Sequence, residues 1–149
     1  MIEGRLRVAI GSLALVGVGL TSYLLYIRWT GATPACTTNG CETVQASSYS
    51  QVLGVPVALL GLLAYAAIFG CALLRNDLGR VAAFSLALAG VAYAAYLFYV
   101  QLAVIHAVCE WCVASDIVMT AVAALALVRL HIAVPQEATV EPLLPRRQA

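Results

Sequence analysis

The sequence predicts an all-α integral membrane protein, built as a bundle of four transmembrane helices. Two observations lead to this prediction. The chain is 63% hydrophobic and only 10% charged, whereas a soluble domain carries about 25% charged residues. The apolar residues also form long continuous runs instead of marking one face of each segment. Too little polar surface therefore remains to solvate a soluble domain.

Four runs have the roughly 20 apolar residues that a helix needs to cross a bilayer. We expect these helices at residues 6–29, 52–74, 81–105 and 111–132. Small residues are spread through all four runs, which favours close helix packing in lipid. We interpret residues 1–132 as one membrane domain. The proline-containing, mixed-charge segment 133–149 is predicted to be a disordered cytoplasmic tail.

All eight basic residues are arginines, and their distribution predicts the orientation of the chain. Seven lie before the first helix, around the short connection 75–80, or near and after the end of the fourth helix, and only Arg28 lies on the other side. By the positive-inside rule, both termini should be cytoplasmic. We therefore expect a multi-pass protein of the inner (cytoplasmic) cell membrane, with the first loop, 30–51, and the third, about 106–108, facing outward.

A row of tyrosines lies near the outer end of the third predicted helix. Tyr93, Tyr96 and Tyr99 recur at helical spacing. They are interpreted either as part of an interfacial aromatic belt or as the wall of a pocket. In the second case Tyr96 is a candidate ligand contact.

Four of the five cysteines gather on the predicted outward side, where disulfides persist. Cys36 and Cys41 lie in the first loop, and Cys109 and Cys112 lie at the start of the fourth helix. Cys71 is isolated near the opposite end of the second helix. We interpret Cys71 as a small buried apolar residue.

The Cys-x-x-Cys spacing at a helix N-terminus predicts redox reactivity. Unpaired backbone N–H groups and the helix dipole favour a thiolate there, and so close a pair forms a small, reducible ring suited to exchange. The loop pair has Pro34, Asn39 and Gly40 nearby, so its backbone can move. A mobile dithiol beside a fixed one suits a relay by thiol–disulfide exchange. Two structural disulfides, or a four-cysteine zinc site, remain as alternatives.

Two segments resemble the vitamin K epoxide reductase family in its bacterial form: CTTNGCETVQASSYSQVLGVPVALLGLLAY, residues 36–65, and CEWC, residues 109–112. The shared order is a loop cysteine pair, a Ser just downstream, a Gly-x-Pro before the second helix and a Cys-x-x-Cys opening the fourth. The resemblance covers about residues 6–130. It implies a four-helix bundle that encloses a quinone and is capped on the extracytoplasmic side by the first loop.

The resemblance also implies an activity and a set of roles. The protein would be a membrane thiol–disulfide oxidoreductase that couples reduction of a quinone (menaquinone, ubiquinone or vitamin K type) to disulfide formation. Cys112 would face the quinone, and Cys109 would exchange with Cys41. Cys36 would exchange with a thioredoxin-like partner, which we expect to be a separate periplasmic or extracytoplasmic protein. No nucleic-acid partner is expected.

Ser47, six residues after Cys41, stands where the family places a Ser near the quinone, and Ser48 is its rival for that role. In the loop pair, Cys36 lies farther along the chain from the second helix. We therefore expect Cys36 to be more exposed than Cys41.

Asp116 lies four residues after Cys112 and shares its helix face. Animal members of the family have a Tyr at this position. An acid inside a spanning helix is usually functional, so Asp116 is a candidate quinone contact that accepts or passes protons. The alternative is an acid that is solvated or stabilised near a helix N-terminus. His106 and Glu110 are interpreted as interfacial, with His106 as a second candidate proton carrier.

Two rival functions remain at this point. The chain could be a non-enzymatic membrane subunit whose outer face is held together by two disulfides. It could also run the opposite reaction, as a quinone or quinone-epoxide reductase like the animal enzymes. The outward placement of the cysteines favours the oxidase.

Overall fold

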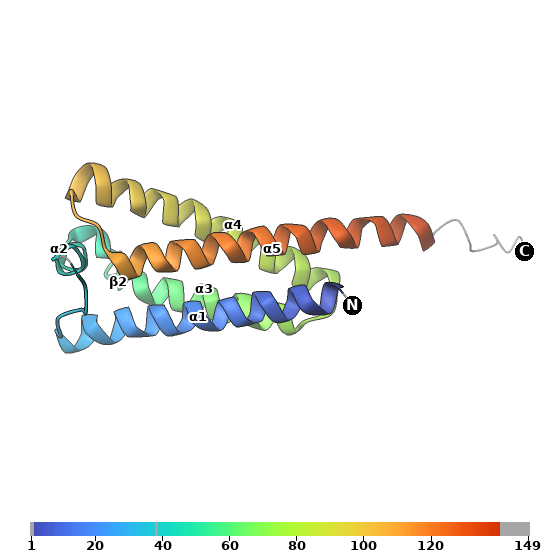
Figure 1. Cartoon of the computed structure of the whole chain (residues 1–149), viewed down its shortest axis with the longest axis horizontal. Helices are drawn as coiled ribbons and strands as arrows, with labels where there is room; N and C mark the ends of the chain where they lie inside the picture. Colours follow the sequence, from blue (N-terminus) through green and yellow to red (C-terminus); the bar gives the residue numbers. More distant parts are fainter. Residues whose placement is uncertain (1, 38, 141–149) are drawn as a thin grey trace, which may run out of the picture.

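The computed structural model describes residues 2–37 and 39–140, with side chains described as far as residue 132. Its long helices run in alternating directions (Figure 1): α1 (Ile2–Thr30), α3 (Val57–Leu73), α4 (Asp77–Val100) and α5 (Glu110–Val140). The shorter elements are α2 (Gly40–Ala46), the 3-10 turn η1 (Ser48–Ser50), the strands β1 (Gln51–Val52) and β2 (Val55–Pro56), and the π-helix η2 (Gln101–Ile105) that extends α4.

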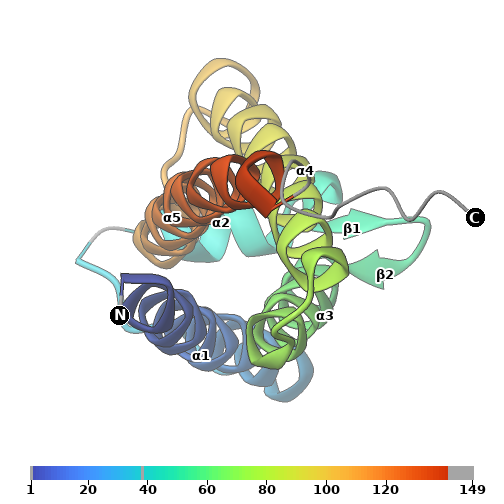
Figure 2. The same ribbon diagram turned by 90° about the vertical axis from the view of Figure 1, so that its right-hand side faces the viewer.

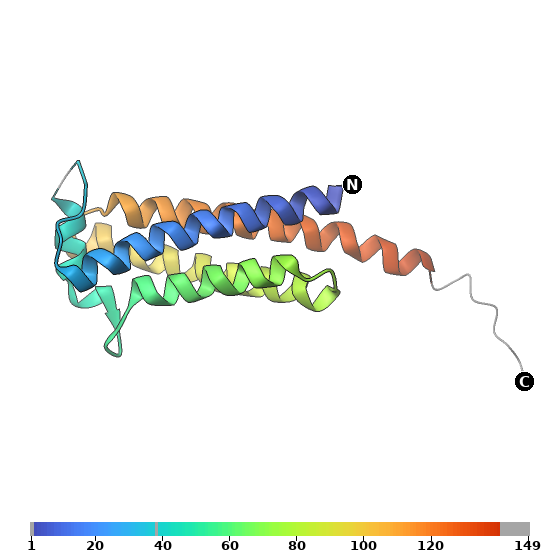
Figure 3. The same cartoon turned by 90° about the horizontal axis from the view of Figure 1, so that it is seen from below.

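The four long helices form a closed ring of neighbours. α1 packs against α3 and α5, and α4 packs against the same two helices. The view along the bundle shows the four helices around a common axis (Figure 2). The short helix α2 lies across the end of the bundle that is away from both termini (Figures 1 and 3).

Three segments are long and apolar enough to cross a membrane: Ile2–Thr30, Asp77–Ile105 and Glu110–Ile132. These lengths and compositions confirm three of the four predicted spans. α3 is apolar but has only 17 residues, the lower limit of the range of roughly 17–25 residues that crosses a bilayer. The crossing of α3 stays a prediction.

The helix boundaries differ from the predicted ones for local reasons. The helix predicted to begin at residue 52 begins at Val57, because the preceding residues form an antiparallel hairpin in which Val52 pairs with Val55. Its two-residue turn places both Leu53 and Gly54 at positive φ, 51° and 83°, as a type I′ turn requires. Glycine adopts this conformation without strain, whereas Leu53 adopts it at a cost.

The other three long helices extend beyond their predicted bounds. α1 spans Ile2–Thr30 where residues 6–29 were expected. α4 begins at Asp77, four residues before the predicted start at residue 81, because the Asn76 side chain caps it by accepting the Gly79 N–H at 3.0 Å. α5 continues to Val140, past the predicted end at residue 132. The segment 133–140, predicted to be a disordered tail, is therefore helical. A single proline such as Pro135 removes one backbone donor but need not end a helix. Residues 141–149 lie outside the described residues.

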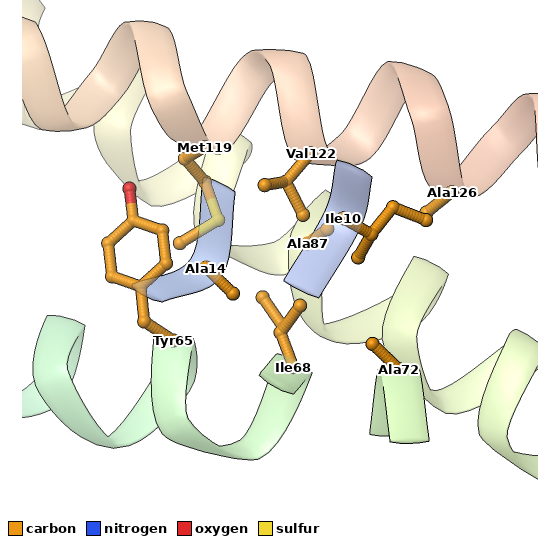
Figure 4. Packing of buried hydrophobic residues seen from close by; sticks show 9 residues of the cluster. All are labelled: Ile10, Ala14, Tyr65, Ile68, Ala72, Ala87, Met119, Val122 and Ala126. Atoms are coloured by element: carbon orange, nitrogen blue, oxygen red, sulfur yellow. The ribbon is translucent and has the colours of Figure 1, made fainter. Parts of the chain in front are cut away.

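One buried cluster joins all four long helices. Figure 4 shows its members: Ile10, Ala14, Tyr65, Ile68, Ala72, Ala87, Met119, Val122 and Ala126. Glycines let the helices approach at this level. Gly17 of α1 lies against the Tyr65 ring, and Gly90 of α4 lies against Met119, whose Sδ would be 2.8 Å from an added Cβ. Packing by small residues is the general solution for helices in lipid.

Arginine side chains stabilise the end of the bundle that lies near the N-terminus and away from α2. Arg7 donates to the carbonyl oxygens of Ala72 (3.0 Å) and Leu73 (2.9 Å) at the end of α3, and Arg129 donates to that of Leu74 (3.2 Å). These bonds satisfy carbonyl groups that a helix end leaves without partners. The arginines of the described region therefore concentrate at this end, as the orientation prediction requires, while the orientation itself stays a prediction.

A glycine substitution tests the packing of α1 against α3. Gly17→Ala should lower the stability of the bundle by about 1–3 kcal/mol, because the new methyl group overlaps the fully buried Tyr65 ring. Thermal unfolding of the detergent-solubilised protein would measure the loss. Gly19→Ala on the same helix is the matched control, since a Cβ at Gly19 meets nothing within 4 Å. Equal melting temperatures for the two variants would contradict this packing.

Candidate active site

Both cysteine pairs lie at the end of the bundle that α2 covers. Cys41 is in α2, and Cys109 directly precedes α5 (Figure 1). Cys36 and Cys41 form a disulfide with a Cα–Cα distance of 6.4 Å, while Cys109 and Cys112 are free thiols. Cys41 and Cys109 are fully buried, and Cys36 is partly exposed. The expectation that Cys36 is the more exposed member of the loop pair is confirmed.

Hydrogen bonds fix Ala35 of the first loop both to the start of α5 and to α1, at a point where the two helices share an aromatic contact. The Trp111 indole N–H donates to the Ala35 carbonyl oxygen at 3.0 Å. The Ala35 N–H in turn donates to the Tyr23 hydroxyl oxygen at 3.1 Å. The Tyr23 and Trp111 rings meet with centroids 4.6 Å apart, a distance typical of favourable aromatic pairs. Trp111, one of the two residues between the cysteines of the Cys-x-x-Cys, therefore contacts the residue next to Cys36.

A second set of contacts fixes the loop beyond Cys36. The Glu110 carboxylate accepts hydrogen bonds from the Thr37 hydroxyl and, at 3.4 Å, from the Thr37 N–H. Gly40 lies so close to the Val108 carbonyl oxygen that a Cβ would overlap it. α2 accordingly packs against both η2 and the start of α5. The two cysteine pairs are thus held in one contact region, with a buried cysteine from each pair.

Cys109 has the surroundings of a reactive thiol. Its backbone N–H donates to Gln101 Oε1 at 2.7 Å, and its sulfur accepts the Cys112 backbone N–H at 3.3 Å. Hydrogen bonding from the Cys112 side chain, helped by the N–H groups of Cys112 and Trp111, lowers the pKa of the Cys109 thiol despite its burial. The start of α5 therefore stabilises a thiolate on Cys109, as predicted for a cysteine at a helix N-terminus.

A cavity of about 250 Å³ lies directly beneath this contact region. Cys112, Asp116 and Ser47, three of the predicted ligand contacts, line it together. Ser48, the rival of Ser47, is exposed and is not part of the wall. The rest of the wall is mainly apolar and comes from all four long helices and the first loop.

The structure places Tyr93, rather than Tyr96, on the wall of the cavity. The Tyr96 side chain is 50% exposed and contacts the Tyr93 ring at a centroid distance of 6.0 Å. Three residues of an α-helix cover about 300°, so each tyrosine of the row points about 60° away from the one before it. The later tyrosines therefore point away from the cavity. The spacing predicted a common face, and only its first residue reaches the wall.

Arg28 is a residue of the site that the sequence analysis did not assign. It extends from α1 over the cavity, where its Nη1 donates to the Gln45 carbonyl oxygen (2.5 Å) and to Ser50 Oγ (3.1 Å). Ser50 Oγ donates to the Ser47 carbonyl oxygen at 2.8 Å. Arg28 therefore holds the segment that carries Ser47 on the bundle. Its position as the sole arginine on the predicted outward side was the signal that could have identified it.

Asp116 has an unsatisfied atom in the cavity wall. Its Oδ2 is buried and has no hydrogen-bond partner among the described residues. The neighbouring residue, Ser115, is tied to α3, because the Tyr65 hydroxyl donates to its carbonyl oxygen at 2.7 Å. A buried acceptor without a partner costs free energy, so this oxygen indicates a place where a ligand or a proton completes the site. Of the two interpretations of Asp116, burial in the wall favours the functional one over solvation.

The remaining candidates lie elsewhere. His106 is exposed in a left-handed turn with φ of 55° and is not part of the cavity wall. Cys71 is half-buried in α3, so it is less enclosed than expected. Among the side chains that the structure describes, in residues 2–37 and 39–132, no group of three or more from His, Cys, Asp or Glu is arranged to hold a metal ion. The disulfide between Cys36 and Cys41 also occupies the two sulfurs that a zinc site would need.

The fold and the site define a class: a helical membrane protein with two adjoining cysteine pairs, one of which lines an enclosed apolar cavity. The model of the vitamin K epoxide reductase family matches residues 8–127. The chain belongs to this family, as the resemblance indicated. Family membership identifies the protein as a membrane oxidoreductase whose chemistry is of the disulfide and quinone type.

The pKa of Cys109 gives a testable pH dependence. In a background of Cys36→Ser, Cys41→Ser and Cys71→Ser, alkylation of Cys109 should follow thiolate formation and persist below the ordinary thiol pKa. Adding Cys112→Ala removes the largest cause of the lowered pKa, so the rate profile should move to higher pH. Alkylation rates across pH, with mass spectrometry to assign the site, would measure this. Thr120→Ala, exposed on α5, is the control, and an unmoved profile in the Cys112 variant would contradict the assigned interaction.

Proposed function

We propose that this protein is a quinone-dependent disulfide-forming oxidoreductase. A partner protein's dithiol would be oxidised to a disulfide, and its two electrons and two protons would pass to a quinone, giving the quinol. One observation carries the proposal. Cys112 lines the apolar cavity, while Cys109 is buried where the loop carrying Cys36 and Cys41 docks. The Cys-x-x-Cys therefore has one sulfur beside a ligand space and the other beside the second cysteine pair.

The exposure of the cysteines supports an order of transfer. A thiolate of the partner attacks the partly exposed Cys36, and Cys41 leaves as a thiolate. The partner's second thiol resolves this mixed disulfide and leaves with its new disulfide. Cys41, buried in α2 beside the start of α5, then attacks Cys109 of the oxidised Cys109–Cys112 pair, and Cys112 leaves as a thiolate. Cys36 attacks Cys41 in turn, which re-forms the loop disulfide and releases Cys109. The two electrons are then held by the Cys109–Cys112 pair, which has become a dithiol.

The residues of the cavity fit the head group of a quinone, which accepts two electrons and two protons when it is bound there. A quinone ring is planar and apolar and carries carbonyl oxygens that accept hydrogen bonds. The wall supplies apolar contacts, the Tyr93 ring and Asp116, whose unsatisfied Oδ2 can donate to such an oxygen when the carboxyl is protonated. A volume of about 250 Å³ is below the roughly 300–1,000 Å³ of drug-sized sites. The cavity therefore suits a ring, with an isoprenoid tail leaving between helices into lipid.

Asp116 is proposed to pass protons between the Cys112 side and the ligand. It shares a helix face with Cys112, and its free oxygen is shielded from solvent. Reduction of the ligand consumes protons, and few other groups of the wall can supply them. The arrangement also disfavours a purely structural role for the cysteines, because disulfides that only stabilise the outer face do not require a cavity beside the Cys112 sulfur.

Substitution of Cys112 tests the function directly. Cys112→Ser should abolish quinone reduction, a loss of at least about 10³-fold, because serine cannot form the disulfide that delivers electrons to the ligand. Purified protein would be supplied with a quinone and a reduced thioredoxin-like protein, and quinone absorbance and thiol loss would be followed together. Cys71→Ser, away from the cap end, is the matched control. Normal turnover in the Cys112 variant would rule out the proposed role.

Trapping of the partner tests the order of transfer. Cys41→Ser should accumulate a mixed disulfide between Cys36 and a thioredoxin-like protein whose second cysteine is replaced by serine and whose first cysteine is activated as a mixed disulfide with a small thiol. The Cys36 thiolate displaces the small thiol, and neither Cys41 nor a second thiol of the partner is present to resolve the new bond. Cys36→Ser should accumulate none, since Cys41 is fully buried. Non-reducing gels of both variants mixed with this activated partner would show the adduct, and the reduced partner, which cannot form it, is the control. An adduct through Cys41 alone would reverse the order, and no adduct in either variant would favour structural disulfides.

A further inference from the structure

Gln101 lies at the point where α4 becomes the π-helix η2, and it is 3% exposed. An amide within an apolar span is costly to bury unless its polar atoms find partners. Gln101 organises the turn between α4 and α5 with two of its groups. Its backbone carbonyl accepts the Ala107 N–H at 3.1 Å, and its side-chain Oε1 accepts the Cys109 N–H at 2.7 Å. The position of Cys109 therefore depends on this one residue.

The direction of the hydrogen bond to Cys109 determines which polar atom of the Gln101 side chain is left without a partner. A backbone N–H donates, so the atom 2.7 Å from Cys109 N must be the oxygen, Oε1, and not the nitrogen. The Nε2 group keeps both of its hydrogens, and it has no partner in the described part of the chain. Gln101 also lines the cavity. The donor left over is thus available to the space that Cys112 and Asp116 share.

Several other polar groups of the wall already donate hydrogen bonds within the protein. The Ser47 hydroxyl already donates to the Val44 carbonyl oxygen at 2.7 Å, and Ser50 donates to the Ser47 carbonyl oxygen at 2.8 Å. Arg28 Nη1 donates to Gln45 and Ser50. Gln101 differs from these residues because its amide is bonded to the backbone of the Cys-x-x-Cys itself, which places its remaining donor, Nε2, near that motif.

We propose that the Gln101 amide bridges the Cys109 backbone and a carbonyl oxygen of the bound quinone, and so positions the Cys-x-x-Cys against its electron acceptor. This inference rests on the proposed function and adds a residue to it. Oε1 accepts the Cys109 N–H in the turn before α5, and Nε2 would donate to a carbonyl oxygen of the ligand. Gln101 is a ligand contact through Nε2 and a positioning residue for Cys109 through Oε1.

The two functions of the amide can be separated by substitution. Gln101→Met keeps the size and removes both hydrogen bonds. Gln101→Glu keeps an oxygen for the Cys109 N–H but can donate toward the ligand only while the carboxyl is protonated. Gln51→Met, in the exposed strand β1, is the control. The probe is a short-tailed benzoquinone, with its equilibrium affinity for the detergent-solubilised protein measured by titration calorimetry. The alkylation rate of Cys109 is measured in parallel.

We expect wild type and Gln51→Met to bind the quinone equally and Gln101→Met to bind it about ten-fold more weakly. Gln101→Glu should bind more tightly at about pH 6 than at about pH 9, since a buried carboxyl can titrate in this range. Arg28, Tyr93, Cys112 and Asp116 line the same cavity, so the wild-type pH profile is the baseline. Cys109 alkylation should stay as in wild type for Gln101→Glu and change for Gln101→Met.

Two results would overturn the inference. One is wild-type affinity in Gln101→Met, and the other is a Gln101→Glu pH profile that matches that of the wild type. A change in alkylation without a change in quinone affinity would reduce Gln101 to a structural residue and would also overturn it. If the wild-type protein itself binds no quinone while Cys109 keeps its reactivity, the proposed function fails, and this inference fails with it.

Discussion

The docking of the first loop onto the start of α5 is the contact on which the site depends. The loop disulfide and the Cys-x-x-Cys belong to segments about 70 residues apart in the chain, and they meet where Trp111 and Glu110 bind the loop backbone at Ala35 and Thr37. Glu110 and Trp111 are the two residues between Cys109 and Cys112. The same residues that space the Cys-x-x-Cys therefore hold its exchange partner, and the absence of a Cβ at Gly40 permits the closest approach.

This docking also closes the cavity from above. Arg28 fixes the segment from Gln45 to Ser50 over the bundle, and the hairpin β1–β2 leads the chain down into α3. Below, Tyr65 and Met119 belong both to the cavity wall and to the buried cluster (Figure 4). The floor is rigid because it is the packed core, whereas the roof is a loop. A ligand is therefore met by fixed apolar walls and by a cover that carries the second cysteine pair.

The sequence was sufficient for those features that follow from composition and local chemistry. Continuous apolar runs predicted the long helices, and the spacing of Cys109 and Cys112 at a helix start predicted a stabilised thiolate. What failed depended on contacts between distant segments or on small rotations. The Tyr93–Tyr99 row fits a helix face, but which tyrosine reaches the cavity is decided by how α4 is rotated against its neighbours. The hydrogen bonds of Arg28 and Gln101 likewise depend on partners outside the helices to which these residues belong.

The two ends of the bundle are held by different kinds of interaction, and the difference suits the chemistry. At the arginine end, Glu3 pairs with Arg80 at 2.7 Å, and the buried Arg129 lies 3.6 Å from the same carboxylate. Solvent screens the partly exposed Glu3 carboxylate, but the Arg129 side chain is 1% exposed, and without Glu3 its charge would be buried without this counter-ion. At the cap end, the loop is held largely by single hydrogen bonds, which contribute about 1 kcal/mol each. Disulfide exchange requires sulfurs to approach in line and then separate. The loop can make that movement at small cost, because the rest of the bundle is held together at its far end.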